Sequence, residues 1–497
     1  MAEKNIIIIG AGLAGLSAGC FARMNGYNAR IFEHHSLPGG VCTSWKRKDY
    51  VFDGCIHFLM GHRPGNAAYE LYQTLGITDS CRFIDLPSYF TIMDESQGRS
   101  FAFTSDITAA FGALKSQSPG DARLLDELLA GAQALRGIDF FGLMKKPQEL
   151  IGIFDKLKIL WAMRSAGRYM SGKYKQRTDV YVKQFKDPWC QFVIKNLFFP
   201  QVPVWFIMML LASLADNQLG YIYGGSLEFV KPIEKKFKGL GGEIAYKATV
   251  EEIIVRNNKA VGVRLADKSE YFADFVISAA DGYSTIFNML GGKYVDDSVN
   301  SMYKTWEMFP GAVMASYGVA KDYSDKPHAD MIKLKKPFNM GGKDIDVIAV
   351  RQFDSRSGYA APGKTGLQVE CLDGDWEFWN NLVKDRRLYD AEKDRISKEL
   401  LTVLEPHYPG MSSAVEVTDV ATPYTTWRYT RNHKGAFEGW LPTPEAISAR
   451  VKKTLPGLGN FYMAGQWVAP GGGVTPCLFS GKQAVQLVCA AEGREFN

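Results

Sequence analysis

The sequence lacks any pair of cysteines at a spacing that would hold a metal or exchange electrons. Its 8 cysteines stand singly, no CxxC occurs, and the 7 histidines do not join them in a zinc-binding pattern. Cysteines used in this way are typical of reduced thiols in the cytoplasm. We therefore predict no disulfide framework, no bound metal and no dithiol relay.

The sequence also lacks a secretion signal and an apolar run long enough to span a membrane. Its first residues, MAEKN, lead directly into a strand-like segment, without the basic stretch and cleavage site of a signal peptide. The apolar run from Val202 to Asp216 is shorter than the ~20 residues that a membrane span requires. We expect this run to form a buried helix, in which Met208 and Met209 could line a channel, and we expect a cytoplasmic protein.

Neither sign of charge dominates the chain. With 58 basic and 53 acidic residues the net charge is +5, which excludes a general binder of polyanions, and no nucleic-acid motif occurs. The composition, 46% hydrophobic and 22% charged, is that of a folded globular protein. A length of 497 residues suggests two or three domains.

The clearest motif is a glycine-rich turn that follows four isoleucines, in NIIIIGAGLAGLSAG at residues 5–19. A β-branched run that stops at glycine predicts a buried parallel strand, with a helix after it. Gly10, Gly12 and Gly15 have the GxGxxG spacing. These glycines permit, in turn, a tight turn, a close approach of backbone to a pyrophosphate, and close packing of helix on strand. The helix N-terminus favours phosphate.

An acidic residue stands where a dinucleotide site needs one. A second strand is predicted to end at Glu33, roughly 20 residues after the turn, where a carboxylate accepts hydrogen bonds from an adenosine ribose. The turn and Glu33 together predict a dinucleotide site. No second strand–GxGxxG–strand unit occurs, so we expect no separate NAD(P)H domain, and the electron donor or acceptor stays unidentified.

Two further segments carry a resemblance to a known family. The second glycine pair, in LPGGVCTSW at residues 37–45, resembles that of the flavoprotein superfamily of amine oxidases and phytoene desaturases, with Val41 in place of the usual arginine. Residues 220–281 contain a glycine pair, a helix for which Ser226 is a suitable N-cap, and several short strands. This segment resembles the middle of phytoene desaturases and retinol saturases.

The C-terminal segment, residues 455–491, resembles the third block of the same family. A strand is predicted to end at Gly465, and Thr475 with Pro476 predicts a helix start with a threonine cap. The family often has an acidic residue after the strand-end glycine, where this chain has Gln466, whose amide can still bond ribityl hydroxyls. In the family this helix points its N-terminus at the flavin ring.

The resemblance implies a non-covalently bound FAD and an α/β fold, in which a Rossmann-like FAD-binding domain of glutathione-reductase type joins an α+β substrate domain. It implies that residues 1–85, 220–285 and 455–497 form the FAD-binding domain, and residues 86–219 and 286–454 the substrate domain. The cofactor contacts that we assign on this basis are Gly10, Gly12, Leu13, Ala14, Gly15, Glu33, Gly39, Gly40, Val250, Gly465, Gln466, Gly473, Val474 and Thr475.

The activity that the resemblance implies is that of an FAD-dependent desaturase or saturase. Such an enzyme adds or removes hydrogen across carbon-carbon bonds of a long apolar isoprenoid, carotenoid, retinoid or related lipid. Two alternatives stay open from the sequence. One is an amine-oxidase-like flavoenzyme, and the other is a non-catalytic flavoprotein that binds a lipid or a membrane partner.

Two residues are candidates for catalysis. His57 lies in FDGCIHFLMGH, residues 52–62, and the family resemblance implies that this strand passes beneath the flavin. An imidazole there could handle the proton that accompanies hydride transfer, although a lone histidine in an apolar strand is more often structural. Tyr429 lies in the aromatic segment 422–442 with Trp427 and Trp440, which wall either the flavin pocket or a domain interface.

Residues 145–177 form a basic, amphipathic stretch. Basic side chains far outnumber Glu149 and Asp155 there, and apolar residues from Leu150 to Trp161 recur at helical spacing. The pattern predicts either a helix on an anionic membrane surface or an ordinary helix with its apolar side in the core.

Overall fold

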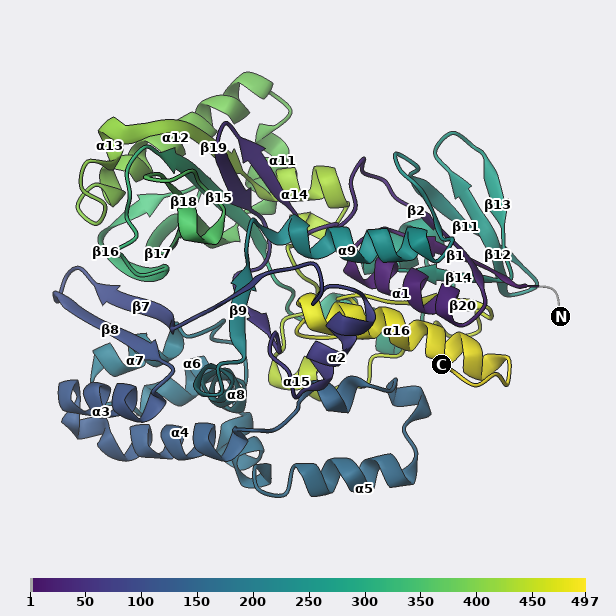
Figure 1. Ribbon diagram of the computed structural model, residues 1–497, viewed down its shortest axis with the longest axis horizontal. Coiled ribbons are helices and arrows are strands. Elements are labelled where there is room, and N and C mark those ends of the chain that lie inside the picture. Colours follow the sequence, from purple (N-terminus) through teal and green to yellow (C-terminus); the bar gives the residue numbers. More distant parts are fainter. Residues whose placement is uncertain (1–2) are drawn as a thin grey trace.

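The computed structural model describes residues 3–497, and its central element is a parallel sheet in the strand order β10-β2-β1-β14-β20. The strands are β1 (Asn5–Ile9), β2 (Asn28–Phe32), β10 (Glu243–Ala245), β14 (Phe275–Ser278) and β20 (Phe461–Met463). Three regions far apart in the sequence thus meet in one Rossmann-like sheet (Figure 1), and the predicted α/β fold is confirmed. All five strands fall within the ranges assigned to the FAD-binding domain, whose boundaries stay a prediction.

The isoleucines of β1 are buried on both faces of this sheet. Ile6 and Ile8 belong to the core that contains residues of α1 (Leu13–Met24), α9 (Ser226–Gly239) and α16 (Val474–Ala491). Ile7 and Ile9 belong to the core beneath a three-stranded antiparallel sheet. Its strands are β11 (Val250–Arg256), β12 (Lys259–Leu265) and β13 (Glu270–Phe272). The continuous apolar run of the sequence is therefore explained by cover on both sides.

Small residues let α1 lie directly against β1 and α16 (Figure 1). A Cβ atom on Gly15 would lie 1.9 Å from the carbonyl oxygen of Gly10, so the third glycine of the motif permits helix-strand packing. A Cβ atom on Gly481 would lie 2.2 Å from the carbonyl oxygen of Ala14. Neither position can accept a side chain without moving backbone.

A seven-stranded sheet forms the second large layer, in the order β19-β15-β18-β17-β16-β7-β8. Its strands are β7 (Ser88–Asp94), β8 (Arg99–Thr104), β15 (Gly311–Val319), β16 (Ala329–Asn339), β17 (Asp344–Asp354), β18 (Thr365–Gly374) and β19 (Val415–Ala421). Four helices pack near β15 and β19, namely α11 (Trp376–Leu382), α12 (Arg386–Leu404), α13 (Met411–Ala414) and α14 (Pro423–Thr430). These elements belong to the ranges assigned to the substrate domain.

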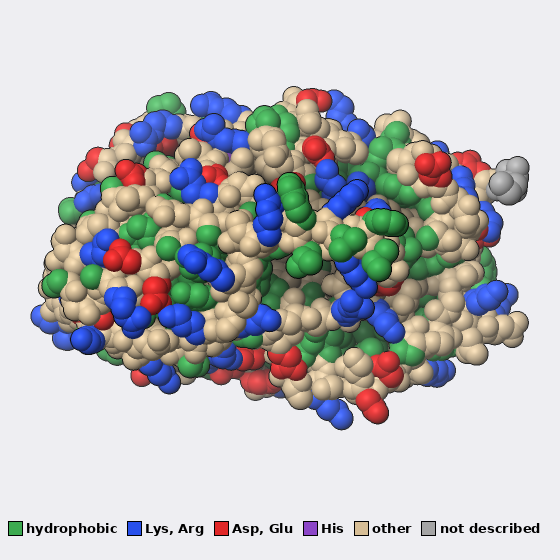
Figure 2. All heavy atoms as spheres, turned by 90° about the horizontal axis from the view of Figure 1, so that it is seen from below, with side chains coloured by type: hydrophobic (Ala, Val, Ile, Leu, Met, Phe, Trp, Pro, Cys, Tyr) green, Lys and Arg blue, Asp and Glu red, His purple; other side chains and the backbone are tan. Residues whose placement is uncertain are grey.

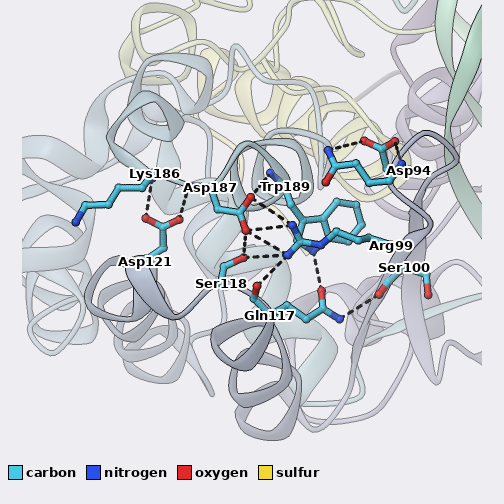
Figure 3. Close-up of polar contacts among 10 residues, drawn as sticks. Asp94, Arg99, Ser100, Gln117, Ser118, Asp121, Lys186, Asp187 and Trp189 are labelled. Atoms are coloured by element: carbon cyan, nitrogen blue, oxygen red, sulfur yellow. Dashed lines mark hydrogen bonds and ion pairs between the residues drawn. The ribbon is translucent and has the colours of Figure 1, made fainter.

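Helices beneath β7 and β8 form a second wall of this region (Figure 1). They are α3 (Ile107–Gln117), α4 (Ala122–Leu135), α6 (Thr178–Tyr181), α7 (Pro188–Lys195) and α8 (Val204–Ala215). The apolar run predicted as a buried helix is α8, and this prediction is confirmed. A polar network ties the helices to the sheet (Figure 3): Arg99 of β8 lies 3.1 Å from Asp187, which accepts a hydrogen bond from the backbone of Trp189 and so caps α7.

Short strands connect the two large layers. They are β3 (Ser44–Arg47), β4 (Tyr50–Asp53), β5 (Leu59–Met60), β6 (Phe83–Asp85) and β9 (Leu219–Ile222). The buried carboxylate of Asp53, at the end of β4, accepts hydrogen bonds from the backbone of Cys55 at 2.9 Å and of Ser226 at 2.6 Å. The side chain of Ser226 donates to the same carboxylate instead of capping its own helix, and Gly225 is the N-cap. The prediction of Ser226 as the N-cap is therefore wrong, because its hydroxyl donates to Asp53 of the distant strand β4.

The cap of α16 also differs from the prediction. Gly473, with φ near +87°, is the N-cap, and the helix begins at Val474. Thr475 is the second residue of the helix, and its hydroxyl is hydrogen-bonded to Tyr72 of α2 (Ala67–Thr74). The Thr475 hydroxyl, which was expected to cap α16, is therefore hydrogen-bonded to the buried hydroxyl of Tyr72 instead.

The basic stretch forms a helix, α5 (Ile153–Ala162), whose apolar side chains face solvent. The side chains in question are 58% to 77% exposed, namely Ile153, Phe154, Leu157, Leu160 and Trp161. The core-packing alternative is therefore wrong. Within residues 3–497, every helix is too short or too polar to cross a membrane. The remaining helices are α10 (Asp297–Thr305) and α15 (Pro444–Ser448).

Candidate active site

Two adjoining cavities lie between the parallel sheet and the seven-stranded sheet. The first has a volume of about 710 Å³ and the second about 750 Å³. They share part of their walls, which we call the junction. The junction residues are Cys55, His57, Leu372, Phe437, Glu438, Gly473 and Val474. Because the turn after β4, strand β18 and the N-terminus of α16 meet here, the junction is where two ligands could react.

Two glycine turns form the floor of the first cavity. The backbone of Gly39 donates to Ala11 at 2.8 Å, and Gly12 and Gly39 form a parallel bridge. Gly39 has φ near +113°, and a Cβ atom on it would lie 2.4 Å from the carbonyl oxygen of Cys42. Gly10 and Gly40 also have positive φ and line the cavity. This arrangement lets a ligand approach bare backbone, as a pyrophosphate requires.

Glu33 lies at one end of the first cavity and is 6% exposed. Its carboxylate accepts hydrogen bonds from the backbone of Ala11 at 2.6 Å and of His35 at 2.7 Å. Burial raises the pKa of Glu33, and the two backbone hydrogen bonds oppose that shift. A carboxylate has lone pairs left beyond these two bonds, so it can also accept ribose hydroxyls. Val250, the first residue of β11, lines the same cavity.

Most of the predicted cofactor residues line this one cavity. Those that do are Gly10, Gly12, Leu13, Ala14, Glu33, Gly39, Gly40, Val250, Gly465, Gln466, Gly473 and Val474. Two predicted residues do not belong to the wall of the first cavity. Gly15 packs against the backbone of Gly10, and Thr475 lines the second cavity. The N-terminal residues of both α1 and α16 are among the twelve, so two helix dipoles present their positive ends to the cavity.

His57 is held at the junction by a buried ion pair that the sequence analysis missed. Its Nε2 atom lies 2.9 Å from Oε1 of Glu370 on β18, without the alignment of a hydrogen bond. Arg351 of β17 lies 3.3 Å from the other oxygen of Glu370 and donates to the carbonyl of His57 at 3.0 Å. Burial would raise the pKa of Glu370, but the charges of His57 and Arg351 outweigh it and lower the pKa to about 2.

A sequence signal for this pair was present. Arg351 and Glu370 are charged residues inside the apolar runs DVIAVRQFD and GLQVECLDG. Charged side chains are rarely buried unless they are paired. Two such residues in neighbouring buried strands could therefore have been flagged, although the pairing itself follows only from the strand register.

Glu438 is the second acidic residue that the sequence analysis missed. It follows Phe437 at the junction and lines both cavities. No hydrogen bond or ion pair to its carboxyl group is present within residues 3–497. Burial raises the pKa of Glu438 to about 8.

The predicted catalytic Tyr429 does not reach the junction. Its ring packs edge-on against His35, with centroids 4.9 Å apart, and it borders only the first cavity, near the Glu33 end. Trp440 is buried against Trp467 and Trp427 packs on Tyr424, and neither belongs to a cavity wall. The structure thus gives no support for a catalytic Tyr429, because the α14 segment that carries it covers the opposite end of the cavity.

The second cavity is predominantly apolar. Its wall includes Phe58, Phe90, Phe198, Phe206, Met209 and Phe309. Of the two methionines expected to line a channel, Met209 does so, whereas Met208 is buried beside Gly131. Outside the junction, the longer polar and charged side chains in its wall are Lys146, Gln148, Asn196, Arg351, Glu370, Lys453 and Gln483. The space suits a long apolar ligand.

Comparisons with known proteins agree with this geometry. A family model described as an NAD(P)-binding Rossmann-like domain matches residues 8–75, and one described as flavin containing amine oxidoreductase matches residues 329–489. These matches support the resemblance to the flavin amine oxidase superfamily that the sequence predicted. FAD is the cofactor of this chain, as predicted from the sequence.

Relatives of this flavoprotein align over nearly its whole length. A chloroplastic prolycopene isomerase from Daucus carota is 25% identical, with 99% of this chain and 81% of the relative aligned. A neurosporene-forming phytoene desaturase from Rhodobacter capsulatus is 24% identical (97% and 93%), and an all-trans-retinol 13,14-reductase from Danio rerio is 22% identical (98% and 86%).

Solved structures show the same fold. An oxidoreductase from Methanosarcina mazei has a TM-score of 0.62 at 16% identity, with 97% of this flavoprotein and 100% of that chain covered. A putrescine oxidase variant has a TM-score of 0.61 at 14% identity, with 98% and 99% covered.

The first cavity fits FAD on the evidence of its own residues. The glycine cradle leaves backbone bare for a pyrophosphate, and Glu33 at one end offers lone pairs to a ribose. The α16 N-terminus lies at the other end, by the junction. Val41 supplies no charge where the family has arginine, so the positive ends of α1 and α16 are the local source of electrostatic support for the phosphates.

Proposed function

We propose that this flavoprotein adds or removes hydrogen across carbon-carbon bonds of a long apolar isoprenoid, such as a carotenoid or retinoid. The observation that carries the proposal is the junction, where an apolar cavity of about 750 Å³ meets the cofactor cavity beside an imidazole-carboxylate pair. The names of the aligned relatives, which include phytoene desaturases, prolycopene isomerases and a retinol reductase, support the same substrate class.

The protein's part in this chemistry begins with holding FAD. Gly10, Gly12 and Gly39 would hold the pyrophosphate, Glu33 would hold the adenosine ribose, and the α16 N-terminus at Gly473 would lie at the flavin end. When bound, FAD supplies a two-electron carrier that accepts or donates hydride. The apolar lining of the second cavity excludes water from the polyene and leaves hydrophobic burial as the main source of substrate affinity.

His57 is the group that we assign to move the accompanying proton. Glu370 faces its Nε2 atom at 2.9 Å and fixes the ring, while Nδ1 makes no hydrogen bond within residues 3–497. Nδ1 is thus free to give a proton to a substrate carbon, or to take one from it, next to the site of hydride transfer. Arg351 and Glu370 act as positioning residues in this account.

An anaerobic titration tests the proposed reaction. Polyene hydrocarbons, retinol and a set of amines are added in turn to the flavin-replete protein, in its oxidised and its chemically reduced form, while the visible spectrum is followed. We expect polyenes to change the oxidation state of the flavin and amines to leave it unchanged. Reduction by an amine would favour the amine-oxidase alternative. Persistent inertness towards every polyene would favour a non-catalytic binding protein.

Membrane contact through residues 145–177 is part of the same proposal. The exposed apolar face of α5 stands among exposed lysines and arginines, including Lys156, Lys158 and Arg164. Figure 2, which views the molecule from the side of α5, shows apolar and basic side chains together around a hollow. Residues just before α5, such as Phe141, Met144 and Ile151, line the second cavity. A helix of this kind fits an anionic lipid surface from which an apolar substrate could enter.

Vesicle flotation tests this contact. We expect binding to vesicles that contain anionic lipid, weaker binding as salt rises above 0.1 M, and strong loss in Phe154→Ser/Trp161→Ser. Phe272→Ser, which removes an exposed aromatic side chain on β13, is the matched control and should bind normally. Equal flotation of the double variant and the control would contradict the assignment to α5.

A further inference from the structure

Glu438 occupies an unusual position for a carboxyl group. It lines both the FAD cavity and the apolar cavity, and no hydrogen bond or ion pair to its carboxyl is present within residues 3–497. Its oxygens lie against the loop that leads into α16, since a Cβ atom on Gly472 would be 2.9 Å from Oε2. Glu438 has intermediate exposure and lines both cavities. An acid left unpaired at a reaction site needs a functional explanation.

The groups that face Glu438 leave it without a fixed counter-charge. Its titratable neighbours are the thiols of Cys55, in the turn after β4, and Cys477, in the first turn of α16. The adjacent thiol of Cys42, together with burial, raises the pKa of Cys55, and burial raises that of Cys477, so both are neutral at physiological pH. His57 is the other titratable side chain at the junction, and Glu370 already lies at ion-pair distance from it.

An acid in this setting responds to any charge that appears beside it. Reduction of FAD adds two electrons at the flavin end of the cavity, and negative charge nearby favours the protonated form of a carboxyl group. The low dielectric of the junction strengthens that coupling. The neutral acid can then donate a hydrogen bond into either cavity, which its carboxylate cannot do.

We propose that, in alkaline solution, Glu438 takes up a proton when the bound FAD is reduced and releases it when the FAD is oxidised. The two electrons come from a hydride-donating substrate or, in the test below, from a chemical reductant such as dithionite. The proton comes from solvent and binds to a carboxylate oxygen of Glu438. Glu438 is thereby a second proton-handling residue of the junction, in addition to His57. The proposal rests on FAD binding with its ring at the junction, and not on the identity of the substrate.

Potentiometric titration of the bound flavin with mediator dyes tests the proposal without any substrate. One extra proton bound per two electrons changes the redox equilibrium constant tenfold per pH unit, about 30 mV for a two-electron couple. We expect the midpoint potential of the wild-type protein to fall more steeply with pH than that of Glu438→Gln, by about this amount in the range above about pH 8. Glu377→Gln, the same change on an exposed face of α11, should follow the wild type.

Equal slopes for the wild type and Glu438→Gln would overturn the proposal, even if both proteins reduce and oxidise normally. If Glu438→Gln fails to retain FAD, Glu438→Asp is titrated in its place, because it keeps the acid but withdraws it from the junction. Infrared difference spectra of the wild type also report the protonated carboxyl directly. A carboxyl band that appears on reduction in alkaline buffer supports the proposal, and its absence overturns it. Failure of the polyene titration alone leaves these readouts intact, so the two proposals can fail separately.

Discussion

The two cavities are built on different principles. The FAD cavity is made of backbone turns, glycines and helix N-termini, which a short local motif can specify. The apolar cavity is made of side chains from α8, β16, β17, β18 and several loops, none of which forms a local motif. The cofactor site is therefore sensitive to single backbone positions, whereas the substrate site depends on long-range assembly and tolerates change one residue at a time.

Gly15→Ala is the substitution expected to do the most damage. The new Cβ atom would lie 1.9 Å from the carbonyl oxygen of Gly10, which cannot move without disturbing β1. We expect a loss of at least about 3 kcal/mol in the free energy of unfolding and the loss of bound flavin. Gly112→Ala, inside α3 with open space around it, should gain roughly 0.5–1 kcal/mol. Denaturant unfolding of both variants makes the comparison, and equal stabilities would contradict it.

Glu33→Arg is expected to remove most of the FAD while the protein stays folded. The change replaces the acceptor of two backbone hydrogen bonds and any bonds to the ribose with a positive charge. Flavin absorbance per protein after gel filtration should fall at least about tenfold, since charge-assisted hydrogen bonds each contribute about 1.5–3 kcal/mol. Glu377→Arg on the surface of α11 serves as the control. Full flavin occupancy in Glu33→Arg would refute the assignment of this residue.

The difference between the cavities also decided what could be predicted from sequence. Gly10, Gly12, Glu33 and the strand before them were predictable, because their roles depend on spacing within some 30 residues. The partners of His57 were not, because Arg351 and Glu370 meet it through the β17–β18 pairing. The caps of α9 and α16 were misassigned for a similar reason: Asp53 and Tyr72, distant in sequence, engage Ser226 and Thr475.

His57→Ala sharpens the comparison at the junction. We expect FAD to stay bound, because His57 is held by side chains and not by the glycine cradle. The rate of the substrate half-reaction should fall by about 10² to 10⁴, the usual size of a general acid-base contribution. His433→Ala changes an imidazole that stacks on Tyr283 outside both cavities and should leave the rate near the wild-type value. An unchanged half-reaction in flavin-replete His57→Ala would remove this residue from the mechanism.

Glu438→Gln should show a smaller effect, on stability and only at higher pH. The pKa of Glu438 is raised to about 8 in the folded protein, against about 4.3 in an unfolded chain. The unfolded state therefore loses its proton first, and the free energy of unfolding falls as pH rises from about 4.3 to about 8. The variant lacks this fall, so it should gain about 1.4 kcal/mol over the wild type for each pH unit between these two values, with no such gain near pH 4. Urea unfolding of the flavin-free proteins at the two pH values checks the sign.

The central claim is that FAD lies with its flavin ring at the junction and its adenosine at Glu33. A crystal structure of the flavin-loaded protein tests this directly. We predict density for the ring beside His57, Phe437 and Glu438, with the ribose within hydrogen-bond distance of Glu33. Density with the cofactor reversed, or with its ring outside the wall shared by the two cavities, would contradict the account.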